Sequence, residues 1–365
     1  MQKTFKALIA LVWLCAAPAK AAEEDTLRQL FSYIPAQYVE PITIEQTAVY
    51  FLKGISAVDK NLRIGNDVDK ISLYYRGGLA KSLRKPQDAD DVQGWTELGG
   101  KMLDEAMQKS ETARQRDFEL VDLMMADAVK NFDKDTKYYS SILPESERAI
   151  HRRNFAARME DDNLYLKIGA FNNFTKEETV KAVKDNPNAK GMILDLRSSP
   201  GGQLSAAVEV ADLFLDEGIV TSVRGRDTNG ITYYNSADGD IFSAKPMVVL
   251  IDGGTSSAAE ILTAALQEQS RATVVGTKSF GKGTIQNLIN LPNGATLSLS
   301  SEYFYTPSGK KLAGAGVVPD ICTYEMPESK NPEWLITEGK DNDCGQENRE
   351  DSGLEPKIAA ILLKI

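Results

Sequence analysis

Two spacings of apolar residues divide the chain into parts with different predicted structures. Within residues 118–132, apolar positions recur every three or four residues, which is the spacing of an amphipathic helix. These positions are Phe118, Val121, Met125, Ala128 and Phe132. Residues 44–62 follow the same spacing less regularly, whereas the polar stretch 85–95 (KPQDADDVQGW) predicts a loop. Residues 24 to about 155 are therefore predicted to be mostly helical, with a charged connector at 144–162.

From Asn163 onward, continuous apolar runs alternate with amphipathic stretches. The runs have the length and composition of buried strands, and the stretches between them have helical spacing. The predicted strands are 164–171, 189–197, 245–254 and 271–276, and the predicted helices are 203–216 and 256–269. Alternating strands and helices predict an α/β fold with a parallel sheet and right-handed crossovers. The stretch 291–307 then predicts a β-hairpin that turns at Asn293-Gly294.

Residues 1–21 have the features of a secretory signal peptide. Two lysines precede an apolar run at 7–17, and the Ala-Lys-Ala at 19–21 offers a small-x-small cleavage site. A membrane anchor is the weaker alternative, because the run is shorter than the roughly 20 apolar residues that cross a bilayer. The mature chain is predicted to start near Ala22 and to be exported.

Charge and cysteine content narrow the range of partners. Removing residues 1–21 takes away three lysines and no acidic residue, which leaves 39 Lys and Arg against 52 Asp and Glu, a net charge of −13. A chain this acidic is a poor candidate for binding nucleic acid. Two cysteines remain after export, Cys322 and Cys344. They either form a disulfide, as an even number in an exported chain suggests, or stay as two buried thiols.

Two glycine-rich turns each follow a predicted strand and lead into a predicted helix. The turn at 200–202 (PGG) follows the strand at 189–197, and the turn at 253–257 (GGTSS) follows the strand at 245–254. In parallel α/β sheets, sites form outside the carboxyl ends of the strands. Helix N-termini also present unpaired N–H groups and partial positive charge. Both turns are therefore placed to receive a developing anion.

Residues 276–282 (GTKSFGK) match the first part of a phosphate-binding loop, G-x-x-x-x-G-K. Such a loop needs Ser or Thr directly after the lysine, followed by a helix. Here Gly283 follows Lys282, Thr284 comes one residue late, and the next residues carry no helical pattern. A nucleotide site is therefore disfavoured, and Lys282 needs another explanation.

Ser257 and Lys282 together suggest a nucleophile and its base. Ser257 lies at the start of the helix at 256–269, where Ser-x-x-Glu also fits a capping box, the structural alternative. The one histidine, His151, lies in the charged connector, which disfavours a Ser-His-Asp triad. A lysine can replace histidine if burial keeps it neutral. Gln286, four residues after Lys282, can share a face with it and orient a neutral amine. An exposed loop lysine and a surface amide are the simpler alternatives for these two residues.

Five stretches, in this order, closely resemble the carboxyl-terminal processing peptidases, also called tail-specific proteases. They are DLRSSPGG (195–202), DGGTSSAAEILTAALQ (252–267), VVGTKSFGKGTIQ (274–286), YTPSGK (305–310) and GAGVVPDI (314–321). The resemblance covers about residues 163–321 and extends weakly to 132–140 (FDKDTKYYS) and 38–41 (YVEP). It implies an α/β fold in which a parallel-sheet catalytic core of the ClpP/crotonase type is joined to a helical N-terminal subdomain.

The same resemblance implies a division of the chain and roles for individual residues. The divisions are a signal peptide (1–21), a helical N-terminal region and connector (22–160), a serine peptidase core (161–325) and a C-terminal segment (326–365). Ser257 matches the family's nucleophile, Lys282 its general base and Gln286 the glutamine that positions the lysine. The oxyanion hole would consist of backbone N–H groups of Ala258 and of Gly201 or Gly202. The implied reaction is peptide-bond hydrolysis through an acyl-enzyme, with no metal or other cofactor.

The chain departs from the family in one respect. Family members carry a PDZ domain between the N-terminal helices and the core, but only 22 residues separate Ser140 from Asn163. A member that lacks this domain is expected to recognise its protein or peptide substrate differently, for example through an activating or adaptor protein. The helical N-terminal region is a candidate contact for a homo-oligomer, and the expected location is the periplasm. The alternatives are a catalytically silent binding or scaffold protein and, on fold alone, a crotonase-like acyl-CoA enzyme.

Overall fold

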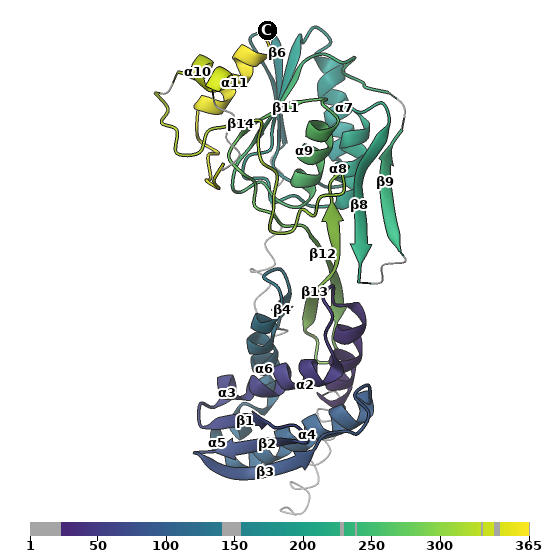
Figure 1. Cartoon of the computed structure of the whole chain (residues 1–365), viewed down its shortest axis with the longest axis vertical. Helices are drawn as coiled ribbons and strands as arrows, with labels where there is room; N and C mark the ends of the chain where they lie inside the picture. Colours follow the sequence, from purple (N-terminus) through teal and green to yellow (C-terminus); the bar gives the residue numbers. More distant parts are fainter. Residues whose placement is uncertain are drawn as a thin grey trace, which may run out of the picture. The chain divides into compact units, whose positions relative to one another are not determined.

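The structure of the 365-residue chain is a computed structural model (Figure 1). It divides into two compact units, of which the first comprises Met1–Arg148 and Gln286–Ser301 and the second Ala149–Ile285 and Glu302–Ile365. The residues that the structure describes are 23–140, 155–226, 230–237, 239–329, 331–338 and 344–364. The predicted signal peptide and His151 lie outside the described residues. Within them, no helix combines the length and the apolar character needed to cross a membrane.

Helices make up much of the first unit. They are a helix at 23–37, α2 (Ile44–Lys53), α3 (Ile55–Val58), α4 (Val92–Lys109), α5 (Glu111–Gln115) and α6 (Leu120–Ala128), with 3₁₀ turns at Asp117–Glu119 and Val129–Asn131. A capping box starts α2, in which Thr43 and Gln46 each donate a backbone N–H to the other's side chain, at 2.9 and 3.0 Å. The predicted apolar face of α6 is confirmed, since Val121, Met125 and Ala128 are buried, but the α-helix is shorter than the pattern suggested.

A three-stranded antiparallel sheet interrupts these helices, so the prediction that residues 24–155 are mostly helical is wrong there. Its strands, in spatial order, are β1 (Leu62–Asn66), β2 (Lys70–Tyr75) and β3 (Gly78–Arg84). The burial of β3 is too low to impose an alternating apolar pattern, so its sequence carries no period-two signal. The available signal was the glycine pair Gly77-Gly78, and in the structure Arg76 and Gly77 both adopt the positive φ of a tight hairpin. A further short strand, β4 (Lys137–Tyr139), pairs with the start of β13 (Thr296–Tyr305).

The second unit is built around a six-stranded sheet that confirms the predicted α/β fold. Its order is β14-β11-β10-β7-β6-β5. The strands are β5 (Phe155–Glu160), β6 (Asn163–Ile168), β7 (Gly191–Asp195), β10 (Met247–Ile251), β11 (Thr273–Gly276) and β14 (Ile321–Cys322). All neighbours are parallel except β5, which runs antiparallel to β6 and occupies residues that the sequence pattern assigned to a connector.

Helices cover both faces of this sheet, because successive side chains of a strand point to opposite sides. The helices are α7 (Thr175–Asp185), α8 (Leu204–Asp212), α9 (Ala258–Glu268), α10 (Pro332–Glu338) and α11 (Leu354–Leu362). In β10, Val249 and Ile251 pack in the core formed with α7, α8 and α9, whereas Val248 and Leu250 pack in the core that contains Ile358 of α11. Figure 1 shows these two groups of helices on opposite sides of the sheet.

A second, antiparallel sheet completes the fold. Its longer strands are β8 (Gly218–Gly225), β9 (Ile231–Ser236), β12 (Thr284–Asn290) and β13 (Thr296–Tyr305). The predicted hairpin turn at Asn293-Gly294 is confirmed between β12 and β13. There, Gly294 N–H donates to Leu291 O, and Leu291 N–H donates to Ala295 O, both at 2.9 Å. The strands β12 and β13 each contain residues of both units.

Candidate active site

Two turns that the sequence singled out meet at the carboxyl edge of the main sheet. The strands β7 and β10 are parallel neighbours, with Leu250 opposite Asp195. The segments that follow them therefore emerge at the same edge. Ser256 N–H donates to Ser199 O at 2.9 Å, which ties the second turn to the first. The prediction that both turns lie together at the strand ends is confirmed.

The buried carboxylate of Asp252 shapes the turn before Ser257. Its Oδ1 accepts hydrogen bonds from the N–H groups of Ser198 at 2.7 Å, Gly254 at 2.9 Å and Thr255 at 3.1 Å. Asp252 has no exposed surface. A buried carboxylate that receives several N–H groups fixes the backbone around it. Asp252 thus holds the two turns against each other.

Ser257 has an unusual backbone conformation for the residue that precedes a helix. Its φ is 56° and its ψ is −122°, outside the regions that non-glycine residues normally occupy. An ordinary N-cap residue is extended and needs no such conformation. Strain of this kind persists only where the surrounding structure imposes it, and it is concentrated at functional sites. The half-buried Ser257 is therefore held at the start of α9 in a way that capping alone does not explain.

Gly201 lets the first turn approach Ser257 closely. With φ at +86°, it adopts a conformation that suits glycine. A Cβ at this position would lie 2.6 Å from Ser256 O, 2.7 Å from Ala258 N and 2.9 Å from Ser257 Cβ. Ala258 is the first residue of α9, so its N–H has no partner within the helix. The turn and the helix N-terminus therefore present backbone on two sides of Ser257.

Replacing Gly201 with alanine is expected to destabilise the second unit. The added Cβ meets backbone atoms that cannot rotate away, and the positive φ is strained for any other residue. We expect the free energy of unfolding to fall by about 1–3 kcal/mol, measured by urea denaturation. Gly230→Ala is the matched control, because a Cβ there meets nothing within 4 Å. Equal unfolding midpoints for the two variants would contradict this account of Gly201.

Lys282 lies in the loop between β11 and β12 and is half-buried. The loop packs tightly, because a Cβ on Gly283 would lie 2.0 Å from Ala313 N. Gly283 is therefore required by close packing, and a serine or threonine of a phosphate-binding loop would not fit there. The chain then enters the strand β12, whereas a phosphate-binding loop is followed by a helix. The structure thus removes the nucleotide interpretation of Lys282.

One carboxylate holds the backbone of both Ser257 and Lys282. Glu260 Oε2 accepts the N–H of Ser257 at 2.8 Å and the N–H of Lys282 at 2.9 Å. Its Oε1 accepts the N–H of Gly281 at 2.7 Å and the hydroxyl of Ser279 at 2.5 Å. Glu260 therefore joins the start of α9 to the loop after β11 through four hydrogen bonds. The structure in this way brings Ser257 and Lys282 to a common side chain.

The environment of Glu260 is that of a buried structural acid. Burial raises the pKa of Glu260 above its ordinary value, and it outweighs the hydrogen bonds from Ser279 and the backbone amides, which act in the opposite direction. The side chain has no exposed surface. In the sequence, Glu260 was visible only as the partner of Ser257 in a capping box. That motif was the available signal, but its second partner, the loop around Lys282, is visible only in the fold.

A buried network of ion pairs stabilises the same edge of the sheet. Arg197 Nη2 lies 2.7 Å from Asp195 Oδ2, and Arg197 Nη1 lies 3.5 Å from Glu355 Oε2. Burial alone would raise the pKa of Asp195, but the hydrogen bonds and charge of Arg197 outweigh it and hold that pKa below its ordinary value. The ionised pair thus anchors the residues that lead into the first turn. Sequence reasoning did not find Glu355, which comes from the distant helix α11.

The other predicted site residues are placed as follows. Gln286 is half-buried on β12 and is counted with the first unit. Lys282 precedes β12 by two residues, so the two residues are not on one regular strand. Cys322 and Cys344 are joined, with an S–S distance of 2.01 Å.

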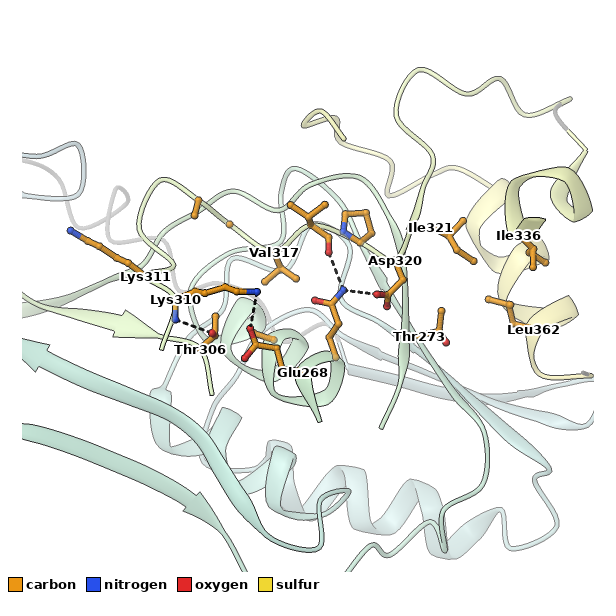
Figure 2. A pocket seen from close by; sticks show the side chains of 16 residues that line it. Glu268, Thr273, Thr306, Lys310, Lys311, Val317, Asp320, Ile321, Ile336 and Leu362 are labelled. Carbon is orange, nitrogen blue, oxygen red and sulfur yellow. Dashed lines mark hydrogen bonds and ion pairs between the residues drawn. The ribbon is translucent and has the colours of Figure 1, made fainter. Parts of the chain in front are cut away.

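A separate cavity of about 860 Å³ lies at the other end of α9 (Figure 2). Gln267 and Glu268, at the C-terminal end of that helix, line it, together with Lys310. Gln267 donates to Val318 O at 2.9 Å and to Asp320 Oδ1 at 3.1 Å. Neither Ser257 nor Lys282 lines this cavity, although Val317, which does, accepts the N–H of Ser279 in the loop before Lys282. The cavity is therefore not the site that Ser257 and Lys282 would form.

Comparison with known proteins matches the region that contains these residues. Residues 162–323 match the model of peptidase family S41. A carboxy-terminal-processing protease of Bartonella bacilliformis is 40% identical over 189 residues, which is 50% of this chain and 44% of that protein. A carboxyl-terminal-processing protease of Synechocystis is 37% identical over 172 residues, covering 45% of this chain and 40% of that protein. This chain thus aligns with less than half of the length of either relative.

Two further comparisons extend beyond the core. A probable CtpA-like serine protease of Staphylococcus aureus is 29% identical over 323 residues, which cover 85% of this chain and 60% of that protein. Among solved structures, a photosystem II D1 C-terminal processing protease is 27% identical with a TM-score of 0.41, and the match covers 57% of this chain and 53% of that one.

Proposed function

We propose that this chain is an exported serine endopeptidase of the carboxyl-terminal processing type, because residues 162–323 match the model of peptidase family S41 and a carboxy-terminal-processing protease is 40% identical over 189 residues. In this proposal Ser257 is the nucleophile and Lys282 the general base. The match to the family supports a peptidase activity. We propose in addition the roles of individual residues, the export and the substrate.

One observation carries the assignment of the two residues. The backbone N–H groups of Ser257 and Lys282 donate to the same oxygen of Glu260, at 2.8 and 2.9 Å. A nucleophile and its base must be held in a fixed mutual position, because catalysis depends on their alignment. A shared, fully buried carboxylate provides such a fixed position. The strained backbone of Ser257 is a second sign of imposed geometry.

The chemistry would proceed by acyl transfer. Lys282 takes the proton of Ser257 Oγ, which attacks the carbonyl carbon of a peptide bond. Lys282 then gives that proton to the leaving amine, and the acyl group stays on Ser257. Lys282 next activates a water molecule, whose attack releases the acyl group as a free carboxyl. Gln286 would orient the amine of Lys282 through its neutral amide.

The oxyanion formed in each step needs hydrogen-bond donors. The N–H of Ala258 at the start of α9 and an N–H of Gly201 or Gly202 are the candidates. Their position is supported by the contact that a Cβ on Gly201 would make with Ala258 N, at 2.7 Å. Loss of one such donor typically lowers the rate by about 10²–10³-fold.

The proposed substrate is a protein or peptide, and the proposed location is the periplasm. Export is supported by the signal-peptide pattern of residues 1–21 and by the joined Cys322 and Cys344. The 22 residues between Ser140 and Asn163 leave too little chain for a PDZ domain. An activating or adaptor protein is therefore the proposed aid to substrate recognition, and the first unit is the proposed contact in a homo-oligomer.

The experiment that tests this function compares the purified protein with its Ser257→Ala variant on an unfolded protein that ends in an apolar tail. Cleavage is followed by mass spectrometry, and the proteins are also treated with a fluorophosphonate probe that labels reactive serines. We expect cleavage and one label per chain for the wild type, and neither for Ser257→Ala. Ser256→Ala is the matched control, which should keep its label.

Either of two results would overturn the proposal. Label that persists in Ser257→Ala would move the nucleophile elsewhere. A folded wild type that neither cleaves the substrate nor takes the label would favour a catalytically silent binding or scaffold protein on this fold.

A further inference from the structure

A segment near the C-terminus contacts both the turn before Ser257 and the loop before Lys282. Residues 344–349 (CGQENR), which we call the strap, belong to the second unit and lie beyond the residues 162–323 that match the family model. The first residue of the strap, Cys344, is joined to Cys322. Cys322 ends β14, where it lies opposite Gly276 of β11. The disulfide therefore fastens the strap to the carboxyl edge of the sheet, beside the loop that follows β11.

The strap contacts the turn that leads to the nucleophile. Gly253 N–H donates to Glu347 O at 2.7 Å. Arg349 N–H donates to Asp252 Oδ2 at 2.9 Å. The other oxygen of Asp252 accepts the N–H groups that shape this turn. The strap thus reaches the residue that organises the turn, five positions before Ser257.

The strap also contacts the loop that leads to Lys282. Lys278 N–H donates to Gly345 O at 2.9 Å, and Thr277 Oγ1 donates to Glu347 O at 2.6 Å. The side chain of Gln346 donates to Ser279 O. Ser279 is in turn bonded to Glu260. Every residue of the segment 277–279 therefore bonds to the strap.

A single carbonyl oxygen connects the turn before Ser257 to the loop before Lys282. Glu347 O accepts the N–H of Gly253 from one side and the hydroxyl of Thr277 from the other, at 2.7 and 2.6 Å. The distance between this turn and this loop therefore depends on where Glu347 lies. This bridge is independent of Glu260, which connects Ser257 and Lys282 further along both segments.

We propose that the strap positions the turn before Ser257 relative to the loop before Lys282, and that the Cys322–Cys344 disulfide makes the activity sensitive to thiols. The activity in question is the serine peptidase activity proposed above, on which this inference rests. The reagent is a small thiol or dithiol reductant, which must reach Cys322 and Cys344 through local opening because both are buried.

The disulfide matters because, beyond Gly345, which lies against the Tyr324 ring, the middle of the strap has little apolar packing. Gln346 and Asn348 are exposed, so burial of apolar surface contributes little in this segment. The far end is held by Arg349, whose Nε donates to the buried Glu355 at 2.6 Å. Without the disulfide, Glu347 would be held by its hydrogen bonds and by its ion pair with Arg349, at 3.3 Å. The turn before Ser257 and the loop before Lys282 would then both be bonded to a much more mobile Glu347.

The redox step is a thiol–disulfide exchange. A dithiol such as dithiothreitol attacks one sulfur of the disulfide, and its second thiol then displaces the remaining protein sulfur. The S–S bond between Cys322 and Cys344 breaks, both cysteines become thiols, and the reagent becomes a cyclic disulfide. Two electrons and two protons pass from the reagent to the protein.

The test compares the oxidised wild type, the same protein reduced with dithiothreitol, and the double variant Cys322→Ser/Cys344→Ser. Peptide cleavage is measured at a temperature at which all three are folded by circular dichroism. We expect kcat to fall by about 10²-fold on reduction and in the double variant, since displacement of about 1 Å can cost that much. KM should change little, because the strap acts on the reacting groups. Dithiothreitol should have no further effect on the double variant.

Hydrogen exchange gives a second readout that does not require activity. The amides of Gly253 and Lys278 donate to the strap, so both should exchange faster in the double variant than in the wild type. Val183→Ala is the matched control, since it removes buried side-chain volume on α7 without touching the strap. It should lower the melting temperature and leave the exchange of Gly253 and Lys278 and the thiol response unchanged.

The outcomes separate this inference from the proposed function. If exchange at Gly253 and Lys278 is unchanged in the double variant, or if that variant is as active as the wild type, the strap proposal is overturned. If the oxidised wild type neither cleaves peptides nor takes the serine probe, the peptidase assignment fails and the thiol sensitivity of the activity fails with it. Faster exchange at both amides would in that case still support the positioning of the two turns by the strap.

Discussion

Replacing Lys282 with alanine is expected to abolish peptide cleavage, with kcat lowered by about 10⁴–10⁶-fold, while the protein stays folded. The variant removes the amine that would take the proton from Ser257. The backbone of residue 282 keeps its hydrogen bond to Glu260, because that bond is made by the N–H. Cleavage of an unfolded substrate and circular dichroism, measured on the same preparations, check both parts of the expectation.

A Lys282→Arg variant separates a base from a positive charge. Arginine keeps the charge and the approximate length but does not lose its proton in proteins. A general base therefore fails in both variants, whereas a lysine that only binds substrate through its charge would be partly rescued by arginine. Lys310→Ala is the control, since the Lys310 side chain is 78% exposed. Cleavage by Lys282→Ala at a rate near that of wild type would refute the assignment.

The Glu260→Gln variant is expected to lower kcat/KM by about 10²-fold and to destabilise the second unit. The carboxylate accepts hydrogen bonds at both oxygens from four donors. A glutamine offers only one oxygen, and its NH₂ group must face either the amides of Ser257 and Lys282 or the Gly281 amide and the Ser279 hydroxyl. At least one backbone N–H then faces another donor in a buried place, which costs about 1–3 kcal/mol. Either orientation of the glutamine shifts a segment that carries a catalytic residue.

Glu209→Gln is the matched control, because Glu209 is an exposed carboxylate on the neighbouring helix α8. Urea denaturation and peptide kinetics should leave it at wild-type values. If Glu260 acts by positioning, its loss should appear in kcat more than in KM. A Glu260→Gln variant with unchanged kcat would show that the proposed alignment of Ser257 and Lys282 does not depend on this carboxylate.

Local sequence patterns were sufficient to predict the core that carries the site. The apolar runs at 189–197 and 245–254 became β7 and β10, and the amphipathic stretch at 256–269 became α9. Such runs are informative because a strand of a parallel sheet is buried on both faces and therefore apolar along its length. The glycine turns that follow these strands were enough to predict that Ser257 lies at the strand ends.

The errors arose where local pattern and tertiary environment disagree. The strands β1 to β3 lie in a stretch predicted to be mostly helical. The strands β1 and β2 do have buried residues, but the exposed strand β3 has no buried face to impose alternation. The strand β5, at Phe155–Glu160, is largely exposed and charged, and its composition resembled that of a connector. In both cases hydrogen bonding to a neighbouring strand, which leaves little trace in composition, determined the structure.

The α/β core, the order of its motifs and the candidate pair Ser257 and Lys282 could be predicted without the fold, because each depends on residues close together in the chain. Only the tertiary structure showed that Glu260 holds both of them, and that the strap at 344–349 joins the turns before them. These contacts link residues that are distant in sequence, and each is made largely to backbone N–H and C=O groups. Every residue carries a backbone carbonyl and all but proline an N–H, so their pairing is decided by how the chain folds and leaves no distinctive mark in the sequence.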